Sequence, residues 1–353
     1  MIYPDQIIHS FSSLGKEFLT AYLYQDIKME EKPPTGSSLA DLIGNSCYYN
    51  PWFIPSFVRF AFNAWAEALR EEKVAHWISR YVPGFSKKNP ATIGIVMAGN
   101  IPMVGLHDLL CILASGNHAL IRLSNGDDHL IPAVLQVLCQ INPEFNDQFS
   151  IAQGPLKNFD AIIATGSNNS SRYFDYYFGK YPHIIRKNRN GVAVITGKET
   201  DDDLRRLSDD IFMYFGLGCR NVSKLYLPDG FKIEDIIPFF EGYSFLSDMH
   251  KYRNNYDYQK SILLINRVSH LDNGFLLTKE DVTLMSPISV IHTESYHSIK
   301  LLNQQLHSLK EQIQCIVSCS KEVNSSIPPG RSQFPELWDY ADGVDTMNFL
   351  MNL

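Results

Sequence analysis

The sequence is poor in cysteine and has no excess of basic residues. Its six cysteines are too sparse and too irregularly spaced for a disulfide framework, which favours free thiols in a reducing compartment. Lys and Arg number 31 against 38 Asp and Glu, and a net charge of −7 argues against nucleic acid or an anionic membrane as the main partner. No stretch reaches the roughly 20 apolar residues of a membrane helix, and the first residues lack the features of a secretory signal. We therefore expect a cytoplasmic protein.

Several common functional motifs are also absent. Neither G-x-G-x-x-G nor G-x-x-x-x-G-K-[ST] occurs, so a nucleotide would have to be held without the usual dinucleotide and P-loop fingerprints. The 11 histidines include no H-E-x-x-H, and the pair Cys315 and Cys319 has no second pair to complete a metal site. We therefore do not expect a metal enzyme.

The composition, 45% hydrophobic and 20% charged, is typical of a globular protein. The sequence divides into four segments. Residues 1–88 predict a helical lead-in that packs on the domain after it, because apolar and aromatic residues recur there at helical spacing. Residues 89–190 predict a nucleotide-binding type of domain and residues 191–326 a second α/β domain. The tail, 327–353, is turn-rich yet aromatic, and we expect it to pack on another surface, for which an oligomer contact is the candidate.

The order of elements predicts the α/β class with two parallel-sheet domains. From residue 89, short apolar strands without polar alternation are joined by amphipathic helices, as in doubly wound sheets that are covered on both faces. In the second domain the apolar runs predict strands at 192–197, 223–228, 261–266, 287–293 and 313–318. Helices are expected there at 201–215, 232–242 and 295–309.

Cys219 is the strongest candidate for a reactive side chain. It follows a predicted helix and a Gly216-x-Gly218 pair, whose glycines leave room beside the sulfur for a substrate and for backbone N–H donors. The thiolate is the reactive form of cysteine, and the neighbouring Arg220 could favour it. The alternative is a small residue in a tight turn, and the other five cysteines are explained by packing.

Two further turns follow strands where open α/β sheets bind ligands. Asn100 ends the first strand, and its amide could donate to a developing oxyanion or simply cap the next helix. Thr165-Gly166-Ser167 follows another strand, where N–H groups could bind a phosphate or form an ordinary turn. The residues alone leave these alternatives open.

Taken in order, IGIVMAGNIPMVGL, GNHALIRLSNGD, ATGS, GVAVITG and FGLGCRNVSKLYLP resemble the aldehyde dehydrogenase superfamily. The form GLGCRNVSKLYLP is similar in particular to the acyl-CoA reductase family, which includes the fatty-acid reductase subunit of bacterial bioluminescence. The resemblance covers about residues 85–320. It implies an aldehyde dehydrogenase-like fold with a Rossmann-like cofactor domain and a catalytic domain.

The resemblance also implies roles for single residues. Cys219 would be the nucleophile that forms a thioester, and Asn100 would be the side-chain donor of the oxyanion hole. Thr165, Gly166 and Ser167 match the turn that contacts the cofactor.

Three residues at the end of a strand bear on the choice of cofactor. Arg122 stands where the superfamily has a lysine that contacts the adenosine ribose, and the strand ends at Ser124. Asn125 replaces an acidic residue at that place, and a guanidinium without a neighbouring carboxylate suits a 2′-phosphate. We therefore expect NADPH, with NADH as the other possibility.

Two positions depart from the superfamily pattern. Where hydrolytic members place a glutamate base, residues 183–191 contain no acid, and Arg186 is nearest to that position. Without a base a thioester resists water but still exchanges with thiols, so the implied direction is from acyl thioester to aldehyde. Leu284 and Thr283 stand where a ribose-binding glutamate is expected.

Three functions remain open at this point. The first is NAD(P)H-dependent reduction of an acyl thioester, such as acyl-CoA, to an aldehyde through a thioester on Cys219. The second is a cofactor-independent cysteine acyltransferase or thioesterase, and the third is a non-catalytic aldehyde dehydrogenase-like protein. The resemblance further implies a partner enzyme that supplies the acyl group, and we expect a homo-oligomer.

Overall fold

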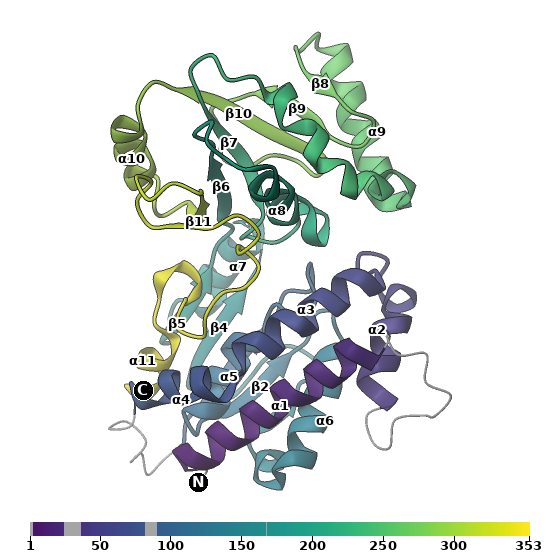
Figure 1. The fold of residues 1–353 in the computed structure, drawn as a ribbon. Coiled ribbons are helices and arrows are strands. Elements are labelled where there is room, and N and C mark those ends of the chain that lie inside the picture. The colour runs from purple at the N-terminus through teal and green to yellow at the C-terminus, as the bar shows by residue number, and fades with distance from the viewer. Residues whose placement is uncertain (1–2, 25–36, 82–89, 167) are drawn as a thin grey trace. The chain divides into compact units, whose positions relative to one another are not determined.

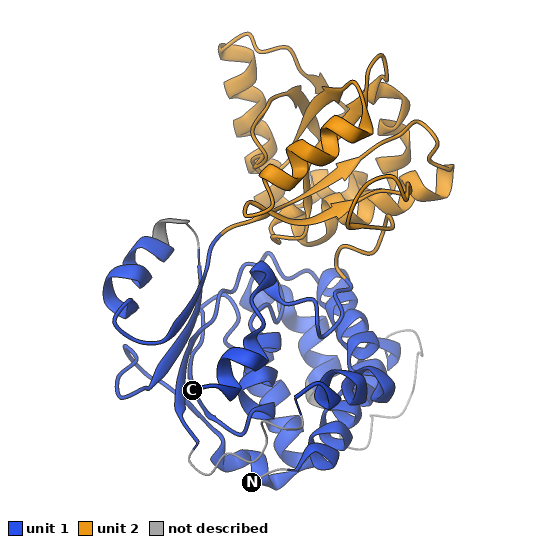
Figure 2. Cartoon of the chain, turned by 90° about the vertical axis from the view of Figure 1, so that its left-hand side faces the viewer, with its two compact units in different colours: residues 1–187, 334–353 blue, residues 188–333 orange. Residues whose placement is uncertain are grey.

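The chain forms two compact units. The computed structural model describes residues 3–24, 37–81, 90–166 and 168–353. Unit 1 contains Met1–Lys187 and Phe334–Leu353, and unit 2 contains Asn188–Gln333 (Figure 2). The chain therefore passes from unit 1 into unit 2 and returns to unit 1 for its last residues.

Unit 1 is built on a five-stranded parallel sheet with the order β3-β2-β1-β4-β5 (Figure 1). The strands are β1 (Thr92–Val96), β2 (His118–Arg122), β3 (Phe149–Ile151), β4 (Ala161–Thr165) and β5 (His183–Arg186). The central strands β1 and β4 are buried along most of their length, which explains their continuous apolar runs. Strand order reverses between β1 and β4, as in doubly wound nucleotide-binding folds, and this confirms the predicted class.

Four helices of the lead-in pack against one another and, through α1 and α2, against α6. The helices of unit 1 are α1 (Pro4–Tyr24), α2 (Ser37–Tyr49), α3 (Pro55–Ala68), α4 (Glu71–Ser79), α5 (Leu106–Ala114), α6 (Leu130–Ile141), α7 (Asn168–Phe178) and α11 (Thr346–Met351), with 3₁₀ turns η2 (Pro143–Asp147) and η6 (Ala341–Gly343). In α1, Ile7, Phe11, Leu14 and Phe18 are fully buried. Their spacing of three and four residues places them on one face, which fixes the helix to its neighbours.

The C-terminal residues are tied to unit 1 by polar side chains. Trp77 Nε1 donates to Tyr340 Oη at 2.8 Å, and Asn117 Nδ2 donates to the Leu350 carbonyl at 3.2 Å. The last residues therefore pack on unit 1 of the same chain, as expected of a segment that covers another surface. A contact with another subunit stays a prediction.

A buried ion pair joins three parts of unit 1. Arg186, at the end of β5, donates from Nη2 to Asp108 Oδ1 at 2.6 Å and from Nε to Asp108 Oδ2 at 3.0 Å. Its guanidinium also bonds Thr346 Oγ1 at 2.8 Å and the Ala341 carbonyl at 2.7 Å. Strand β5, helix α5 and the C-terminal residues thus share one network.

Unit 2 contains a seven-stranded sheet with the order β12-β11-β6-β7-β10-β9-β8, parallel except for the β8–β9 pair. Its strands are β6 (Asn190–Val194), β7 (Val222–Pro228), β8 (Leu271–Asp272), β9 (Leu277–Glu280), β10 (Val290–Tyr296), β11 (Ile313–Val317) and β12 (Ser326–Ile327). Its helices are α8 (Asp201–Phe212), α9 (His250–Ile265), α10 (Ile299–Ser308) and the 3₁₀ segments η3 (Met213–Gly216), η4 (Ile233–Asp235) and η5 (Ile237–Asp248). Leu302 and Leu306 of α10 pack on Val192, Val194 and Tyr226 of the sheet.

One local prediction for unit 2 is wrong. The apolar run 261–266 is not a strand but the end of helix α9, because a short apolar run has no periodicity that separates the two. The helix expected at 232–242 is present as two 3₁₀ segments, η4 and η5. In the described part of the chain, no helix is long and apolar enough to span a membrane.

Candidate active site

The candidate residues of unit 1 share one edge of its sheet. Asn100 follows β1 and is exposed, while Arg122 is the last residue of β2 and Thr165 the last of β4; both are half-buried. In register, Val96 of β1 lies opposite Arg122. The carboxyl ends of β2, β1 and β4 therefore place these side chains around the position where strand order reverses, which is where such sheets bind ligands. Gly166 is half-buried beside Thr165, and Ser167 lies outside the described residues.

The loops after β1 and β2 are packed tightly together. A Cβ atom on Gly99 would lie 2.6 Å from Ser124 Oγ and 2.9 Å from the Asp127 nitrogen. A Cβ on Gly126 would lie 2.6 Å from the Gly99 carbonyl oxygen, and Asn50 Nδ2 donates to the Gly126 carbonyl at 2.9 Å. Both glycines are therefore required, and the loop after β1, which carries the predicted oxyanion donor, is fixed against the loop after β2.

The Asp127 side chain joins the loop after β2 to the loop after β1. It was not singled out from the sequence. Its Oδ2 accepts a 2.7 Å hydrogen bond from the backbone N–H of Met103, whose φ of 55° is left-handed. The carboxyl is almost fully buried, and Oδ1 has no partner among the described residues. Burial raises the pKa of Asp127 to about 7, against the opposing effect of the Met103 N–H. A single aspartate at a predicted helix start gives no signal for this contact, which spans 24 residues.

We expect Asp127→Asn to remove a pH dependence of stability. The folded-state pKa lies above the unfolded value, so the protonated carboxyl stabilises the fold at low pH and this stability is lost as the pH rises from about 4 to 7. Wild type should lose roughly 3 to 4 kcal/mol over that range, whereas the amide cannot ionise. Urea unfolding midpoints between pH 4 and 8 measure the difference. Parallel curves for the two proteins would show that Asp127 does not titrate there.

In unit 2, Cys219 lies on a turn between η3 and β7, and its side chain is exposed. Before it, Tyr214, Phe215 and Gly216 have φ values of 54°, 59° and 73°, a left-handed turn of three consecutive residues. Left-handed backbone costs about 1–2 kcal/mol per non-glycine residue. Tyr214 and Phe215 are buried, and such strained segments are found at functional sites more often than elsewhere.

Asn221 fastens the two ends of this turn together. Its Nδ2 donates to the carbonyls of Asp210 at 3.1 Å and Met213 at 2.8 Å, at the end of α8. Its Oδ1 accepts from the Gly218 N–H at 2.8 Å, one residue before Cys219. Because Asn221 is 2% exposed, these bonds are shielded from water and hold the cysteine turn in one conformation.

The sheet supports the same turn from the other side. The Gly191 N–H donates to the Asn221 carbonyl at 3.0 Å, and a Cβ on Gly191 would lie 2.7 Å from the carbonyl oxygens of Arg220 and Asn221. Arg220 Nε donates to the Ser332 carbonyl at 2.6 Å. The Arg220 guanidinium is thus bonded to backbone within unit 2, and its predicted role beside the sulfur stays a prediction.

Asn221→Ala should lower turnover without weakening nucleotide binding. Loss of the clamp frees the Gly218 N–H and the α8 carbonyls, and misplacement of a nucleophile by about 1 Å can cost on the order of 10²-fold in rate. We expect kcat to fall about 10- to 100-fold. Asn266→Ala is the matched control, because that exposed amide also donates to a helix carbonyl, of Ile262, but outside the cysteine turn. Equal kinetics for both variants would contradict the assignment.

The other cysteines of unit 2 are held by different partners. Cys315 Sγ donates to the Arg220 carbonyl at 3.4 Å, and burial raises its pKa to about 12. Cys319 Sγ donates to Glu199 Oε1 at 3.2 Å, and burial together with this carboxylate raises its pKa to about 11. Both thiols are therefore poor nucleophiles at neutral pH. Among the described residues no group of three or more His, Cys, Asp or Glu side chains could hold a metal ion.

The segment expected to carry a ribose-binding acid contains none at the predicted positions. Leu284 is buried in the core of unit 2. Thr283 Oγ1 donates to Asp281 Oδ1 at 2.8 Å, and Asp281 is in turn paired with Lys279 at 2.7 Å. These groups satisfy one another within the β9–β10 region. Phe212, Tyr214 and Phe215 are buried in the core of unit 2.

Comparison with known families gives one match. The family model of acyl-CoA reductase (LuxC) matches residues 68–237, which include all strands of the unit 1 sheet, the Cys219 turn and β7. This segment of the chain is similar to the acyl-CoA reductase (LuxC) family. The recognition made from GLGCRNVSKLYLP is therefore confirmed, and the family indicates an oxidoreductase. A search of curated proteins gave no significant match.

Solved structures place the chain in the aldehyde dehydrogenase fold. Aldehyde dehydrogenase 21 from Physcomitrella patens superposes with a TM-score of 0.66 at 12% identity, over 98% of this chain and 84% of that one. An NAD-dependent aldehyde dehydrogenase from Sinorhizobium meliloti gives 0.61 at 10%, over 91% and 72%. Glyceraldehyde-3-phosphate dehydrogenase GapN from Methanocaldococcus jannaschii, complexed with NADP, gives 0.59 at 9%, over 92% and 77%. At these identities the likeness shows the shared fold.

Proposed function

We propose that this protein reduces an acyl thioester, such as acyl-CoA, to an aldehyde with NADPH, through a thioester on Cys219. The single observation that carries the proposal is the exposed Cys219 on a strained, clamped turn inside the segment that the acyl-CoA reductase family model matches. A strained backbone is maintained only where surrounding contacts enforce it, and here Asn221 and Gly191 do so.

The proposed chemistry assigns one task to each group. Cys219 Sγ attacks the thioester carbonyl carbon, and the carbon–sulfur bond to the carrier breaks to release the carrier thiol. The Asn100 amide donates a hydrogen bond to the carbonyl oxygen while that oxygen carries negative charge. NADPH, when bound, supplies the hydride that converts the acyl carbon to the aldehyde level. The bond between this carbon and Cys219 Sγ then breaks, which releases the aldehyde and regenerates the Cys219 thiolate.

The unit 1 sheet edge fits a dinucleotide. Ligands of doubly wound sheets bind outside the carboxyl ends at the point of reversal, and Arg122 and Thr165 end the two strands that flank β1 there. Gly99 and Gly126 bring the backbone of two loops together at the same edge. We propose that Arg122 and Ser124 contact the adenosine ribose with its 2′-phosphate, and that Thr165, Gly166 and Ser167 contact the remainder of the cofactor.

The direction of the reaction rests on Arg186. In the structure its guanidinium is bonded to Thr346, to a backbone carbonyl and to both carboxylate oxygens of Asp108, so the position of the expected base holds a cation and the adjacent carboxylate is engaged by it. A Cys219 thioester without a neighbouring base hydrolyses slowly, which leaves reduction by hydride as the productive route.

The test is oxidation of NADPH and of NADH, followed by absorbance, with acyl-CoA thioesters of increasing chain length. We expect oxidation that requires the thioester and is faster with NADPH, and the panel also reports acyl preference. Release of CoA without nucleotide would instead support a cysteine acyltransferase or thioesterase. A protein that binds NADPH but does not oxidise it in the presence of any thioester of the panel would contradict the proposed function.

A further inference from the structure

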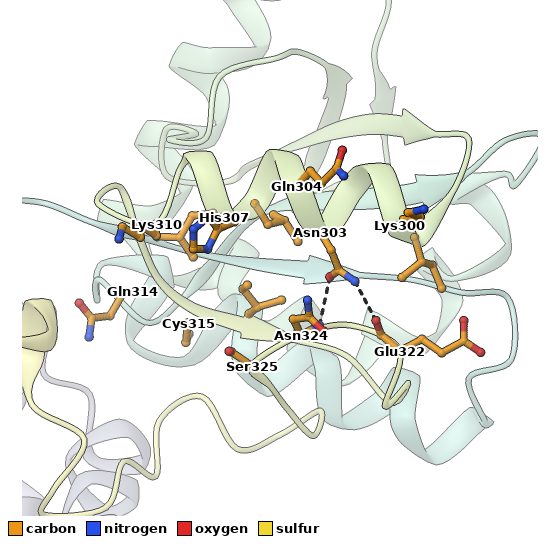
Figure 3. A pocket seen from close by; sticks show the side chains of 14 residues that line it. Lys300, Asn303, Gln304, His307, Lys310, Gln314, Cys315, Glu322, Asn324 and Ser325 are labelled. Carbon is orange, nitrogen blue, oxygen red and sulfur yellow. Dashed lines mark hydrogen bonds between the residues drawn. The ribbon is translucent and has the colours of Figure 1, made fainter.

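Unit 2 contains a large pocket apart from the cysteine turn. It has a volume of about 790 Å³ and lies between helix α10, strand β11 and the turn 322–325 (Figure 3). Its walls combine cationic, amide and aliphatic side chains. No role has been given to it above.

The pocket is held open by fixed walls. Leu302 and Leu306 anchor α10 in the core of unit 2. On the pocket side, Asn303 Nδ2 donates to the Glu322 carbonyl at 2.8 Å, and its Oδ1 accepts from the Asn324 N–H at 3.0 Å (Figure 3). One asparagine thus joins the helix to the opposite turn, so a ligand would meet a preformed site.

The charges are unevenly distributed along the pocket. His307, Lys310 and Gln314 lie at one end, whereas Lys300 and the only acid of the lining, Glu322, lie at the other (Figure 3). In the described part of the chain, no carboxylate pairs with Lys310. The first end therefore offers a lysine ammonium, an imidazole and an amide to an anion, in a protein whose net charge is −7.

The C-terminus of α10 does not repel an anion from this end of the pocket. A helix C-terminus repels negative charge because its last carbonyls are unpaired. Here the carbonyls of Gln305, His307 and Leu309 accept from the backbone N–H groups of residues 309, 310 and 312, respectively. The negative end of the helix is therefore largely satisfied by the following turn.

The middle of the pocket is neither charged nor purely apolar. Gln304, Asn324 and Ser325 offer hydrogen-bonding groups, while Ile299, Ile313 and Ile316 offer aliphatic surface. An elongated ligand with amide and methyl groups and a phosphate at one end matches this sequence of surfaces. Pantetheine phosphate has that composition.

The pocket is also connected to the nucleophile through unit 2. Cys315 lines it, and the Cys315 thiol donates to the carbonyl of Arg220, the residue after Cys219. A ligand on this wall thus lies against strand β11, which contacts the cysteine turn through Cys315.

We propose that this pocket binds the phosphate-bearing pantetheine part of acyl-CoA, with Lys310 and His307 at the phosphates. This inference rests on the proposed function, because it names where the carrier of that substrate is held. Lys310 and His307 act in binding the carrier and not in the acyl chemistry.

The kinetic test compares two substrates with the same acyl group. The double variant Lys310→Gln, His307→Gln should raise KM for acyl-CoA about tenfold, since two charge-assisted contacts are lost, with kcat unchanged. KM for the acyl thioester of N-acetylcysteamine, which has no phosphate, should not change. Lys232→Gln, an exposed lysine of unit 2 outside the pocket, is the control. The proposal would be overturned if the double variant raised KM equally for acyl-CoA and for the N-acetylcysteamine thioester. It would also be overturned if KM for acyl-CoA did not change.

A binding test separates this inference from the proposed function. In calorimetry, CoA should bind wild type about tenfold more tightly than the double variant, and pantetheine without phosphates should bind both equally. This result would support the pocket even in a protein that shows no turnover. Turnover with acyl-CoA in wild type, combined with unchanged CoA affinity in the variant, would retain the function and reject the pocket.

Discussion

Cys219→Ala is expected to reduce acyl-CoA-dependent NADPH oxidation by at least about 10³-fold, because no other group can form the thioester. Nucleotide affinity should be unchanged, since Arg122 and Thr165 belong to the other unit of the chain. The direct measurement is acylation: wild type mixed with labelled acyl-CoA and no NADPH should retain the acyl label after denaturation, and the variant should not.

Cys319→Ala is the matched control for this prediction. Cys319 is also exposed and also in unit 2, but its thiol donates to Glu199 and its pKa is raised to about 11. It is therefore a poor thiolate, and the variant should keep wild-type turnover and acylation. Iodoacetamide at neutral pH should label Cys219 before Cys319. Retention of the acyl label by Cys219→Ala, or simultaneous loss of turnover and nucleotide binding, would contradict the assigned role.

The sequence was sufficient to predict those features of the site that depend on neighbouring residues. Apolar runs without alternation predicted a parallel sheet, and the positions of Asn100, Arg122 and Thr165 at strand ends follow directly from that. Gly216 and Gly218 marked the turn of Cys219. Each of these inferences uses only local pattern and the rule that carboxyl ends of parallel strands share an edge.

Features that depend on distant contacts were not predictable in this way. Nothing local predicts left-handed backbone at Tyr214 and Phe215, because bulky aromatic residues disfavour it, and the contacts that impose it come from packing. Asn221 resembles an ordinary turn residue until its bonds to the end of α8 are seen. Asp127 likewise acquires its role only when the loop with Met103 folds over it. The bonds of Asn221 to the end of α8 span 8 and 11 residues and the bond of Asp127 to Met103 spans 24, which is beyond the range of a turn pattern.

The same reasoning applies to Arg186, which the sequence marked only as the residue nearest to an expected base. Its partner Asp108 lies 78 residues earlier and is equally buried. Burial raises the pKa of the Asp108 carboxyl, but the charge and hydrogen bonds of Arg186 outweigh this and hold the pKa below its usual range. Both groups are therefore charged at neutral pH in a site from which water is excluded.

Asp108→Asn is accordingly expected to destabilise unit 1 by roughly 3–5 kcal/mol, because the Arg186 charge is left buried without a counter-charge. The depressed pKa means that the carboxylate stabilises the fold above its unfolded pKa and that this contribution is lost as the pH falls through the lower, folded value. The acid limb of the wild-type stability curve should therefore be steeper than that of the variant. Urea unfolding between pH 2 and 7, followed by tryptophan fluorescence, measures both effects.

A double replacement distinguishes the charge from the packing. Asp108→Leu combined with Arg186→Met removes both charges while keeping apolar volume, and we expect it to be less destabilising than Asp108→Asn alone, since the buried guanidinium is removed together with its counter-charge. Trp77 reports the C-terminal residues through its bond to Tyr340, so its fluorescence should change before global unfolding in Asp108→Asn but not in the double variant. If the double variant were the less stable of the two, the network would act by its specific bonds to Thr346 and the Ala341 carbonyl, and the charge pair would not be the dominant contribution.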